Sequence, residues 1–215
     1  MTTTIVLADD HVVVRDGLRR LLEEQGDLQV VGETGDGLEV VELVKKLRPN
    51  VLLLDIMLPG LNGAEVARQV RKRVAATAIL MLSMHADESY VLSALRNGAR
   101  GYVVKSARPE ELVEAVRAVA AGRHFLSSEV ADRAALLYAR EAKNLPPDPF
   151  DTLTTRERQV LHLLAEGLTY AEAAERLGVS ARTVETHRTN LARKLELSTP
   201  TELARYAIRR GLVSV

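Results

Sequence analysis

Short apolar runs alternate with helical patterns over the first 122 residues of the chain. Five runs predict strands, at residues 4–8, 28–32, 51–54, 79–83 and 101–104. Four of them are rich in valine, isoleucine or leucine without polar alternation, which is typical of parallel strands buried on both faces. Helical spacing follows each run, at residues 12–25, 36–48, 63–73, 87–97 and 109–121. The pattern predicts an α/β domain with a doubly wound, five-stranded parallel sheet.

From residue 153 onward the pattern is helical throughout. Helices are predicted at residues 155–166, 170–177, 181–195 and 200–210. Three of them begin with the sequence Thr-x-x-Glu, a capping box, at Thr154, Thr169 and Thr199. A short helix, a tight turn at Gly178 and a longer helix follow the plan of a helix-turn-helix. This part of the chain is therefore expected to form a small all-α domain of four helices.

The segment between these two regions has the character of a linker. A helix is predicted from about Ser128 to residue 143, and the prolines that follow, Pro146, Pro147 and Pro149, favour an extended tether. We therefore expect one domain at residues 1–122, a linker with a helix at 123–150 and a second domain at 151–215.

Composition narrows the classes of protein. The 215 residues include 29 acidic and 29 basic side chains, so the net charge of zero indicates nothing about a polyanionic partner. The absence of cysteine excludes disulfides, thiolate zinc sites and cysteine nucleophiles. No apolar stretch is long enough to cross a membrane, and the first residues lack the pattern of a secretion signal. A cytoplasmic protein with no membrane partner is expected.

Acidic residues follow two of the predicted strands. Asp9 and Asp10 end the first strand and Asp55 ends the third, so their carboxylates converge at one edge of a parallel sheet. Their mutual repulsion is offset by a divalent cation, and an all-oxygen donor set favours Mg²⁺. Ser83 and Lys105 end the fourth and fifth strands and bring a hydroxyl and an ammonium to the same edge. Together these groups suit phosphoryl transfer to Asp55 as the nucleophile.

Residues 3–121 closely resemble the receiver domains of response regulators. The likeness is carried by Ala8-Asp9-Asp10-His11, Leu54-Asp55-Ile56-Met57-Leu58-Pro59-Gly60, Ser83, Gly101-Tyr102 and Lys105. The resemblance implies a flavodoxin-like fold and phosphorylation of Asp55 by a sensor histidine kinase. It also implies that Asp10, Asp55 and the Met57 carbonyl hold Mg²⁺, with Asp9 acting mainly through a bound water.

The same resemblance makes Ser83 and Tyr102 the switch pair that responds to phosphorylation. One departure from the family concerns the residue after Lys105. Many receivers have proline there in a cis peptide, whereas this chain has Ser106. Because a cis bond before a residue other than proline costs about 2.5–4 kcal/mol, the resemblance leaves the isomer of this bond open.

Residues 153–212 resemble the LuxR-type four-helix DNA-binding domain. The likeness is carried by Leu153-Thr154, Arg156-Glu157, Val160-Leu161, Gly167-Leu168-Thr169, Leu177-Gly178-Val179-Ser180 and Thr183-Val184-Glu185-Thr186-His187-Arg188 with Asn190-Leu191. Together with the receiver, this resemblance indicates the NarL/FixJ class of regulators. It implies binding to double-stranded DNA at inverted-repeat operators, a homodimer when phosphorylated, and contact with RNA polymerase as a further possibility.

The helix predicted at residues 181–195 has the pattern of a recognition helix. Val184, Leu191 and Leu195 form its apolar stripe, and the helix carries four basic residues against one acidic residue. Such local basic charge is typical of a surface that meets a phosphate backbone. The residues expected to face base edges are Glu185, Thr186 and Thr189. The residues expected chiefly to contact phosphates are Arg182, Thr183, Arg188 and Lys194, and Arg193 is a further DNA-binding candidate.

Two assignments in this domain rest on the family pattern. His187 lies between the apolar and DNA-facing stripes, and both a packing role and a phosphate contact stay open for it. The last helix is the dimerisation surface in the family, where Leu203, Tyr206 and Ala207 are the candidates here.

Two other functions are compatible with parts of the sequence. A Mg²⁺-dependent phosphatase of the haloacid dehalogenase kind also uses an aspartate nucleophile at a strand end, but it has a second aspartate two residues later, where this chain has Met57. A regulator that works unphosphorylated, through protein contacts alone, is disfavoured by the complete acidic site. We therefore expect a regulator that catalyses only its own phosphoryl transfer and a slow loss of that phosphoryl group.

Overall fold

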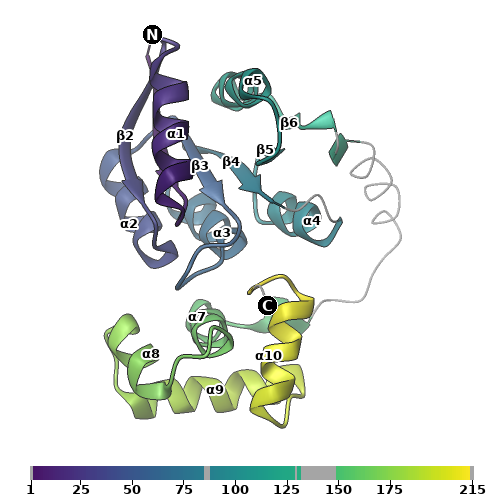
Figure 1. Ribbon diagram of the computed structural model, residues 1–215. Coiled ribbons are helices and arrows are strands. Elements are labelled where there is room, and N and C mark those ends of the chain that lie inside the picture. Colours follow the sequence, from purple (N-terminus) through teal and green to yellow (C-terminus); the bar gives the residue numbers. More distant parts are fainter. Residues whose placement is uncertain (1, 85–87, 129, 132–148, 214–215) are drawn as a thin grey trace. The chain divides into compact units, whose positions relative to one another are not determined.

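The computed structural model describes residues 2–84, 88–128, 130–131 and 149–213. The chain divides into two compact units, Met1–Ala142 and Lys143–Val215 (Figure 1). The first unit alternates strands and helices, and the described part of the second is helical. Both fold classes agree with the pattern of the sequence.

A parallel sheet forms the centre of the first unit. Its strands are β1 (Thr3–Ala8), β2 (Leu28–Thr34), β3 (Val51–Asp55), β4 (Ala78–Ser83), β5 (Gly101–Val104) and β6 (Phe125–Leu126). They lie in the order β2-β1-β3-β4-β5-β6, and every neighbouring pair is parallel. The chain runs outward from β1 to β2 and then crosses back to β3. Since ligands of such sheets bind where the strand order reverses, the carboxyl ends of β1 and β3 mark the expected site.

Helices cover both faces of the sheet (Figure 1). They are α1 (Val12–Glu23), α2 (Gly37–Leu47), α3 (Gly63–Arg73), α4 (Glu88–Arg96) and α5 (Pro109–Ala120). All five residues of β3 are buried, because Leu52 and Leu54 belong to the core on one face while Val51 and Leu53 belong to the core on the other. Burial on both faces explains why the strands have no polar alternation.

The sheet has one strand more than the sequence pattern predicted. Phe125 donates its amide hydrogen to the Arg100 carbonyl at 3.1 Å, and Ser127 donates to the Tyr102 carbonyl at 3.0 Å. These bonds place β6 beside β5, in a segment that was expected to be linker. A strand of two residues is too short to produce a hydrophobic pattern, so it could not be predicted. Most of the expected linker helix, together with Pro146 and Pro147, lies outside the described residues. Pro149, which was expected in an extended tether, begins a 3-10 helix instead.

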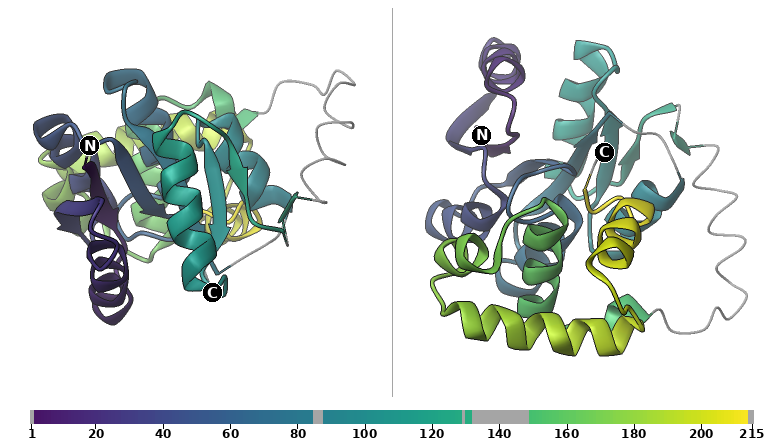
Figure 2. Two further views of the ribbon diagram at one scale, coloured as in Figure 1. Left: turned by 90° about the horizontal axis from the view of Figure 1, so that it is seen from above. Right: turned by 60° about the horizontal axis from the view of Figure 1, so that its bottom comes forward.

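Four α-helices and a short 3-10 helix make up the described part of the second unit. They are η1 (Pro149–Thr152), α7 (Thr155–Ala165), α8 (Tyr170–Leu177), α9 (Ala181–Leu195) and α10 (Pro200–Arg209). Complete capping boxes begin α7, α8 and α10, as the sequence predicted. Gly178 ends α8 with a φ of 63°, a left-handed conformation that favours glycine. The long helix α9 packs against both α7 and α8 (Figure 2).

Among the described residues, none of the helices combines the length and the apolar character that a transmembrane span requires.

Candidate functional site

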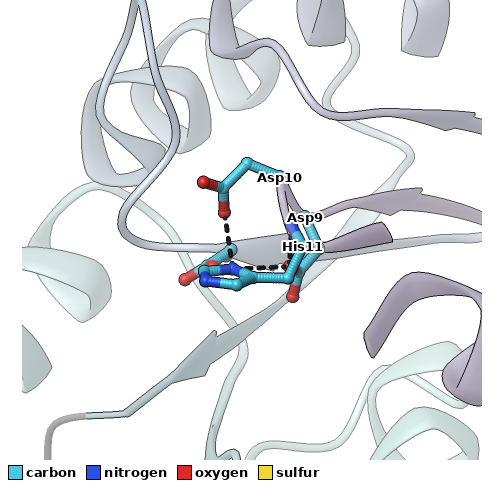
Figure 3. Close-up of side chains that lie close together, drawn as sticks. Asp9, Asp10 and His11 are labelled. Carbon is cyan, nitrogen blue, oxygen red and sulfur yellow. Dashed lines mark hydrogen bonds and ion pairs between the residues drawn. The ribbon is translucent and has the colours of Figure 1, made fainter. Parts of the chain in front are cut away.

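The acidic residues of the first unit meet at the carboxyl ends of β1 and β3. Asp9 and Asp55 are buried, whereas Asp10 and His11 are exposed. One potential ligand atom from each of these residues lies within 4.8 Å of the others: Asp9, Asp10, His11 and Asp55. The His11 ring places Nδ1 2.8 Å from Asp10 Oδ1 and 3.4 Å from Asp9 Oδ1 (Figure 3). The convergence that the strand ends predicted is therefore present.

Lys105 lies between the two buried carboxylates. Its Nζ atom is 2.6 Å from Asp55 Oδ2 and 2.7 Å from Asp9 Oδ2. The main chain holds this lysine in place, because its amide donates to the Ser83 carbonyl at 2.7 Å. The amide of Met57 donates to Asp55 Oδ1 at 3.1 Å and so orients the nucleophile. The predicted role of the Met57 carbonyl as a metal ligand stays a prediction.

Burial and neighbouring charges have opposite effects on the pKa values of Asp55 and Lys105. Burial raises the pKa of the Asp55 carboxyl, and the Lys105 ammonium partly offsets that effect. Burial by itself would lower the pKa of Lys105, but its hydrogen bonds to Asp55 and Asp9 outweigh burial and raise it. Lys105 is therefore a cation at neutral pH. The cluster holds three carboxylates, two of them in contact with the single ammonium, so anionic oxygen is in excess and the donor set fits Mg²⁺.

The predicted switch residues lie on neighbouring strands. Ser83 ends β4 and Tyr102 lies in β5, and both side chains are fully buried. Met81 pairs with Tyr102, and Ser83 lies two residues beyond Met81 on the same strand. Because side chains alternate along a strand, Ser83 and Tyr102 share one face of the sheet. The peptide between Lys105 and Ser106 is trans, which settles the isomer that the sequence left open.

In the second unit, α9 presents an exposed polar face. Val184, Leu191 and Leu195 are buried, so the apolar stripe of this helix points inward as predicted. A hollow on the opposite side is lined by Arg182, Glu185, Thr186, Thr189 and Asn190. Sequence reasoning had not assigned Asn190 to this surface, although its position four residues after Thr186 could have suggested it.

The remaining predicted DNA contacts of α9 differ in exposure. Arg193 is exposed, while Thr183, His187 and Arg188 are partly buried. The partial burial of His187 is compatible with both roles that were considered for it.

Lys194 takes a different role from the one expected. Its Nζ atom lies 2.7 Å from Glu157 Oε2 and 3.1 Å from the Thr152 carbonyl oxygen. Burial would raise the pKa of Glu157, but the bonds from Lys194 and Thr154 outweigh it and lower that pKa. The ammonium of Lys194 therefore ties α9 to α7 and η1. The phosphate contact expected of this residue stays a prediction, and in the structure its charge is engaged within the unit.

The candidate dimer contacts on α10 also need correction. Leu203 and Ala207 are buried, and Tyr206 is partly buried. This helix packs against α7, so Leu203 and Ala207 are unavailable to a second copy of the chain. Arg205 and Ile208 are exposed on the same helix instead. The apolar face of α10 was taken for an interface, whereas it forms part of the unit's own core.

Comparison with known proteins identifies the same two parts. Residues 5–117 match the family model for the response regulator receiver domain, and residues 151–207 match the model for bacterial regulatory proteins of the luxR family. The oxygen regulatory protein NreC of Staphylococcus carnosus is 38% identical over 213 residues, which is 97% of this chain and 98% of NreC.

Solved structures agree. A two-component response regulator of the LuxR family from an Aurantimonas species is 39% identical with a TM-score of 0.62, over 65% of this chain and 99% of that one. The response regulator RcsB, in a structure of its complex with DNA, is 26% identical with a TM-score of 0.60, over 96% of this chain and 98% of that one. This chain therefore belongs to the two-component response regulators of the NarL/FixJ class, which join a receiver domain to a LuxR-type helix-turn-helix domain.

Proposed function

We propose that this response regulator binds DNA under the control of phosphorylation at Asp55. The observation that carries the proposal is the contact of Asp55 with Lys105 at 2.6 Å, at the carboxyl edge of the sheet and beside Asp9 and Asp10. A carboxylate that is oriented by an amide and paired with a buried ammonium is suited to nucleophilic attack on phosphorus.

The phosphoryl donor is a sensor histidine kinase. The Asp55 carboxylate attacks the phosphorus of the kinase's phosphohistidine, and the new O–P bond forms as the N–P bond breaks. The imidazole leaves with the electron pair and takes up a proton from solvent. Lys105 stabilises the negative charge on the phosphoryl oxygens. Asp10, Asp55 and the Met57 carbonyl, with Asp9 through water, would hold Mg²⁺, which offsets that charge when it is bound.

A surface for the kinase lies next to this site. The side chains of Val12 and Val13, in the first turn of α1, are 58% and 85% exposed. On the same helix, Val14 and Leu18 line an apolar hollow that also includes Lys105. Exposed apolar side chains commonly mark protein contacts. A kinase that brings its phosphohistidine to Asp55 would cover this surface.

Phosphorylation would be read by Ser83 and Tyr102. Adding a charge of about −2 to Asp55 draws the Ser83 hydroxyl toward the phosphoryl group, and the Tyr102 ring, which is already buried, repacks behind it. The change alters the surface around α4 and β5 and promotes dimerisation. In the second unit, the exposed Arg205 and Ile208 are the dimer contacts that we propose in place of the buried residues of α10.

The exposed face of α9 would enter the major groove of DNA. The hydroxyls of Thr186 and Thr189 donate to the carbonyls of Arg182 and Glu185, at 2.9 and 3.0 Å. The methyl groups of the two threonines are then suited to apolar contact with thymine methyl groups, and Glu185 can accept a hydrogen bond from cytosine. Phosphate contacts come from Arg182, Thr183, Arg188 and Arg193. A two-fold dimer would bind inverted repeats.

Labelling with a small phosphodonor tests the proposal. With Mg²⁺ and acetyl phosphate, the wild-type chain should gain one acid-stable, base-labile phosphoryl group and bind its operator more tightly. Asp55→Asn should gain none, whereas the control Asp16→Asn, which changes an exposed acid on α1, should behave as wild type. Labelling of Asp55→Asn would refute the assignment. Turnover of small phosphate esters would instead favour the phosphatase.

A further inference from the structure

Arg15, in the first turns of α1, contacts the main chain of the acidic site. Its Nη1 atom donates a hydrogen bond to the carbonyl oxygen of Asp9, and its Nε atom lies 3.5 Å from Glu33 Oε2. Glu33 also accepts a hydrogen bond from Arg19 Nε at 2.5 Å. The side chains of Arg15 and Glu33 are each only 17% exposed. A partly buried guanidinium thus joins the loop after β1 to strand β2.

Other contacts leave this loop little freedom. The amide of Asp9 donates to the Thr34 carbonyl at 3.1 Å, and the amide of His11 donates to Asp9 Oδ1 at 2.9 Å. A Cβ atom at Gly35 would lie 3.3 Å from both Arg15 Nη1 and Asp10 Cα, so the main chain, the guanidinium and the loop approach one another closely. The direction of the Asp9 and Asp10 carboxylates therefore depends on where Arg15 holds the Asp9 carbonyl.

We propose that Arg15 is a positioning residue for the divalent cation of this site. It holds the Asp9–Asp10 loop through the main chain, so that both carboxylates are oriented before the cation binds. The inference rests on the proposed function, because it assumes that these carboxylates hold Mg²⁺. Groups that orient metal ligands without touching the metal commonly change its affinity about 10- to 100-fold when they are removed.

The chemistry of arginine fits this task. Its planar guanidinium presents two nitrogens at once: Nη1 donates a hydrogen bond to a carbonyl oxygen, and Nε forms an ion pair with the Glu33 carboxylate. A lysine at the same position has a single nitrogen and a shorter reach, so it would not keep both contacts. Glu33 offsets the charge of Arg15, which limits its repulsion of a bound cation.

Positioning and simple charge make opposite predictions. A cation next to a metal site repels the metal, so removing the charge of Arg15 would strengthen Mg²⁺ binding if charge were its main effect. If Arg15 acts by positioning the loop, its removal weakens Mg²⁺ binding. The sign of the change in affinity separates the two.

The test is a calorimetric titration of the full chain with MgCl₂, without phosphodonor. Arg15→Met and Arg15→Lys should each raise the dissociation constant of Mg²⁺ about 10-fold. The matched control is Arg19→Met, which removes a cation of the same helix that binds Glu33 and not the Asp9 carbonyl. We expect the dissociation constant of Mg²⁺ in the control to stay within about 2-fold of wild type, since Arg15 keeps its contact with the Asp9 carbonyl.

A second measurement follows the rate of phosphorylation by acetyl phosphate against Mg²⁺ concentration. The half-saturating Mg²⁺ concentration should rise by the same factor as the dissociation constant, with the maximal rate unchanged. A merely structural role would lower the maximal rate, through loss of folded protein, and leave half-saturation where it was. If Arg15→Met does not fold, Arg15→Lys, which keeps the charge, decides alone.

Unchanged or tighter Mg²⁺ binding in the Arg15 variants would overturn the proposal, as would an equal weakening in Arg19→Met. A wild-type chain that binds Mg²⁺ but takes up no phosphoryl group would refute the proposed function, while the calorimetric titrations would still decide the role of Arg15. A wild-type chain that binds no Mg²⁺ would refute both.

Discussion

Lys105 shows how a single buried charge controls the acidic site. Its side chain is only 9% exposed and lies within 2.7 Å of two carboxylates that are nearly inaccessible to solvent. The ammonium cancels part of the mutual repulsion between these carboxylates. Lys105 thus contributes to the stability of the unphosphorylated site.

Replacing this lysine should therefore make folding depend on Mg²⁺. Breaking a buried ion pair by removing one partner costs about 3–5 kcal/mol, so Lys105→Met should lower the free energy of unfolding by about that amount in EDTA. Mg²⁺ should restore much of the loss, because it supplies the missing positive charge. Urea unfolding in EDTA and in MgCl₂ measures both effects. Equal destabilisation under the two conditions would contradict this account of the site.

Neighbouring residues of α9 should differ in what they contribute to DNA binding. Arg188→Ala should weaken binding to all sequences alike and lower the salt slope by about one unit, because a phosphate contact carries little sequence information. Thr189→Ala should change the preferred bases at a cost of about 1–3 kcal/mol in discrimination and keep the slope. Titration against a randomised operator library at two salt concentrations distinguishes them. Unaltered base preferences in Thr189→Ala would mean that α9 lies differently in the groove.

At the level of whole elements, one contact extends the first unit into the segment that was expected to be linker, and another joins two helices within the second unit. Strand β6 extends the sheet beside β5, which carries Tyr102 and precedes Lys105. In the other unit, Lys194 and Glu157 join α9 to α7. The first unit therefore includes the start of the expected linker, at residues 125–127.

The hydrogen bond from the Ser127 amide to the Tyr102 carbonyl, next to β6, can be removed without changing a side chain of the acidic site. Ser127→Pro deletes the amide that donates to the Tyr102 carbonyl and should lower the stability of the first unit by about 1–2 kcal/mol. Because that carbonyl belongs to the proposed switch residue, the ratio of DNA affinities with and without phosphorylation should also fall. The matched control is Ser128→Pro, since Ser128 is exposed and begins a helix, where proline is tolerated. Equal effects of the two substitutions would argue against a specific role for the bond.

The link between α7 and α9 should be sensitive to acid. The folded unit lowers the pKa of Glu157, so this carboxylate stabilises the fold above its unfolded pKa, and the contribution is lost as pH falls through the lowered value. Glu157→Gln should therefore lower stability by about 1–2 kcal/mol at pH 7, with the difference from wild type vanishing at low pH. Hydrogen exchange of the α7 and α9 amides in the full chain measures this difference in stability. A difference that persisted at low pH would show that the charge is not its cause.

At the level of the whole molecule, the proposed regulation would place two copies of the chain on one operator. Ile208 is 39% exposed on α10 and is the apolar residue that this helix offers to a partner. The single units supply the chemistry and the DNA-reading face, and the proposed dimer supplies affinity for paired half-sites.

Ile208→Glu should accordingly weaken binding to an inverted repeat at least 10-fold and leave binding to an isolated half-site unchanged, because it adds like charges across a two-fold contact. Phosphorylation of Asp55 should be unaffected. Arg209→Glu, which changes another exposed residue of α10, tests whether added negative charge alone weakens binding to the inverted repeat. Titration of labelled DNA that carries one half-site or two measures the ratio of the two affinities. Loss of half-site binding would place Ile208 in the fold or the DNA contact instead.

Local pattern and topology were enough to predict most of the fold and the acidic site. Unbroken apolar runs require parallel strands that are covered on both faces, and the ends of such strands meet at one edge. Asp9, Asp55 and Lys105 could therefore be brought together before any distance was known. The capping boxes and the apolar stripe of α9 are equally local, because hydrogen bonds within three residues and helical spacing define them.

Contacts between distant segments needed the tertiary structure. Strand β6 is held by the edge of β5 and by no pattern of its own, and Lys194 reaches Glu157 only after α9 packs on α7. An apolar face on α10 gives the same sequence pattern whether it packs against its own unit or against a second chain. In the structure, Leu203 and Ala207 are buried within the unit. The bond from Arg15 to the Asp9 carbonyl likewise depends on where α1 lies against the sheet. The packing of helices and strands decides which distant side chains meet, and the spacing of residues along the chain does not specify that packing.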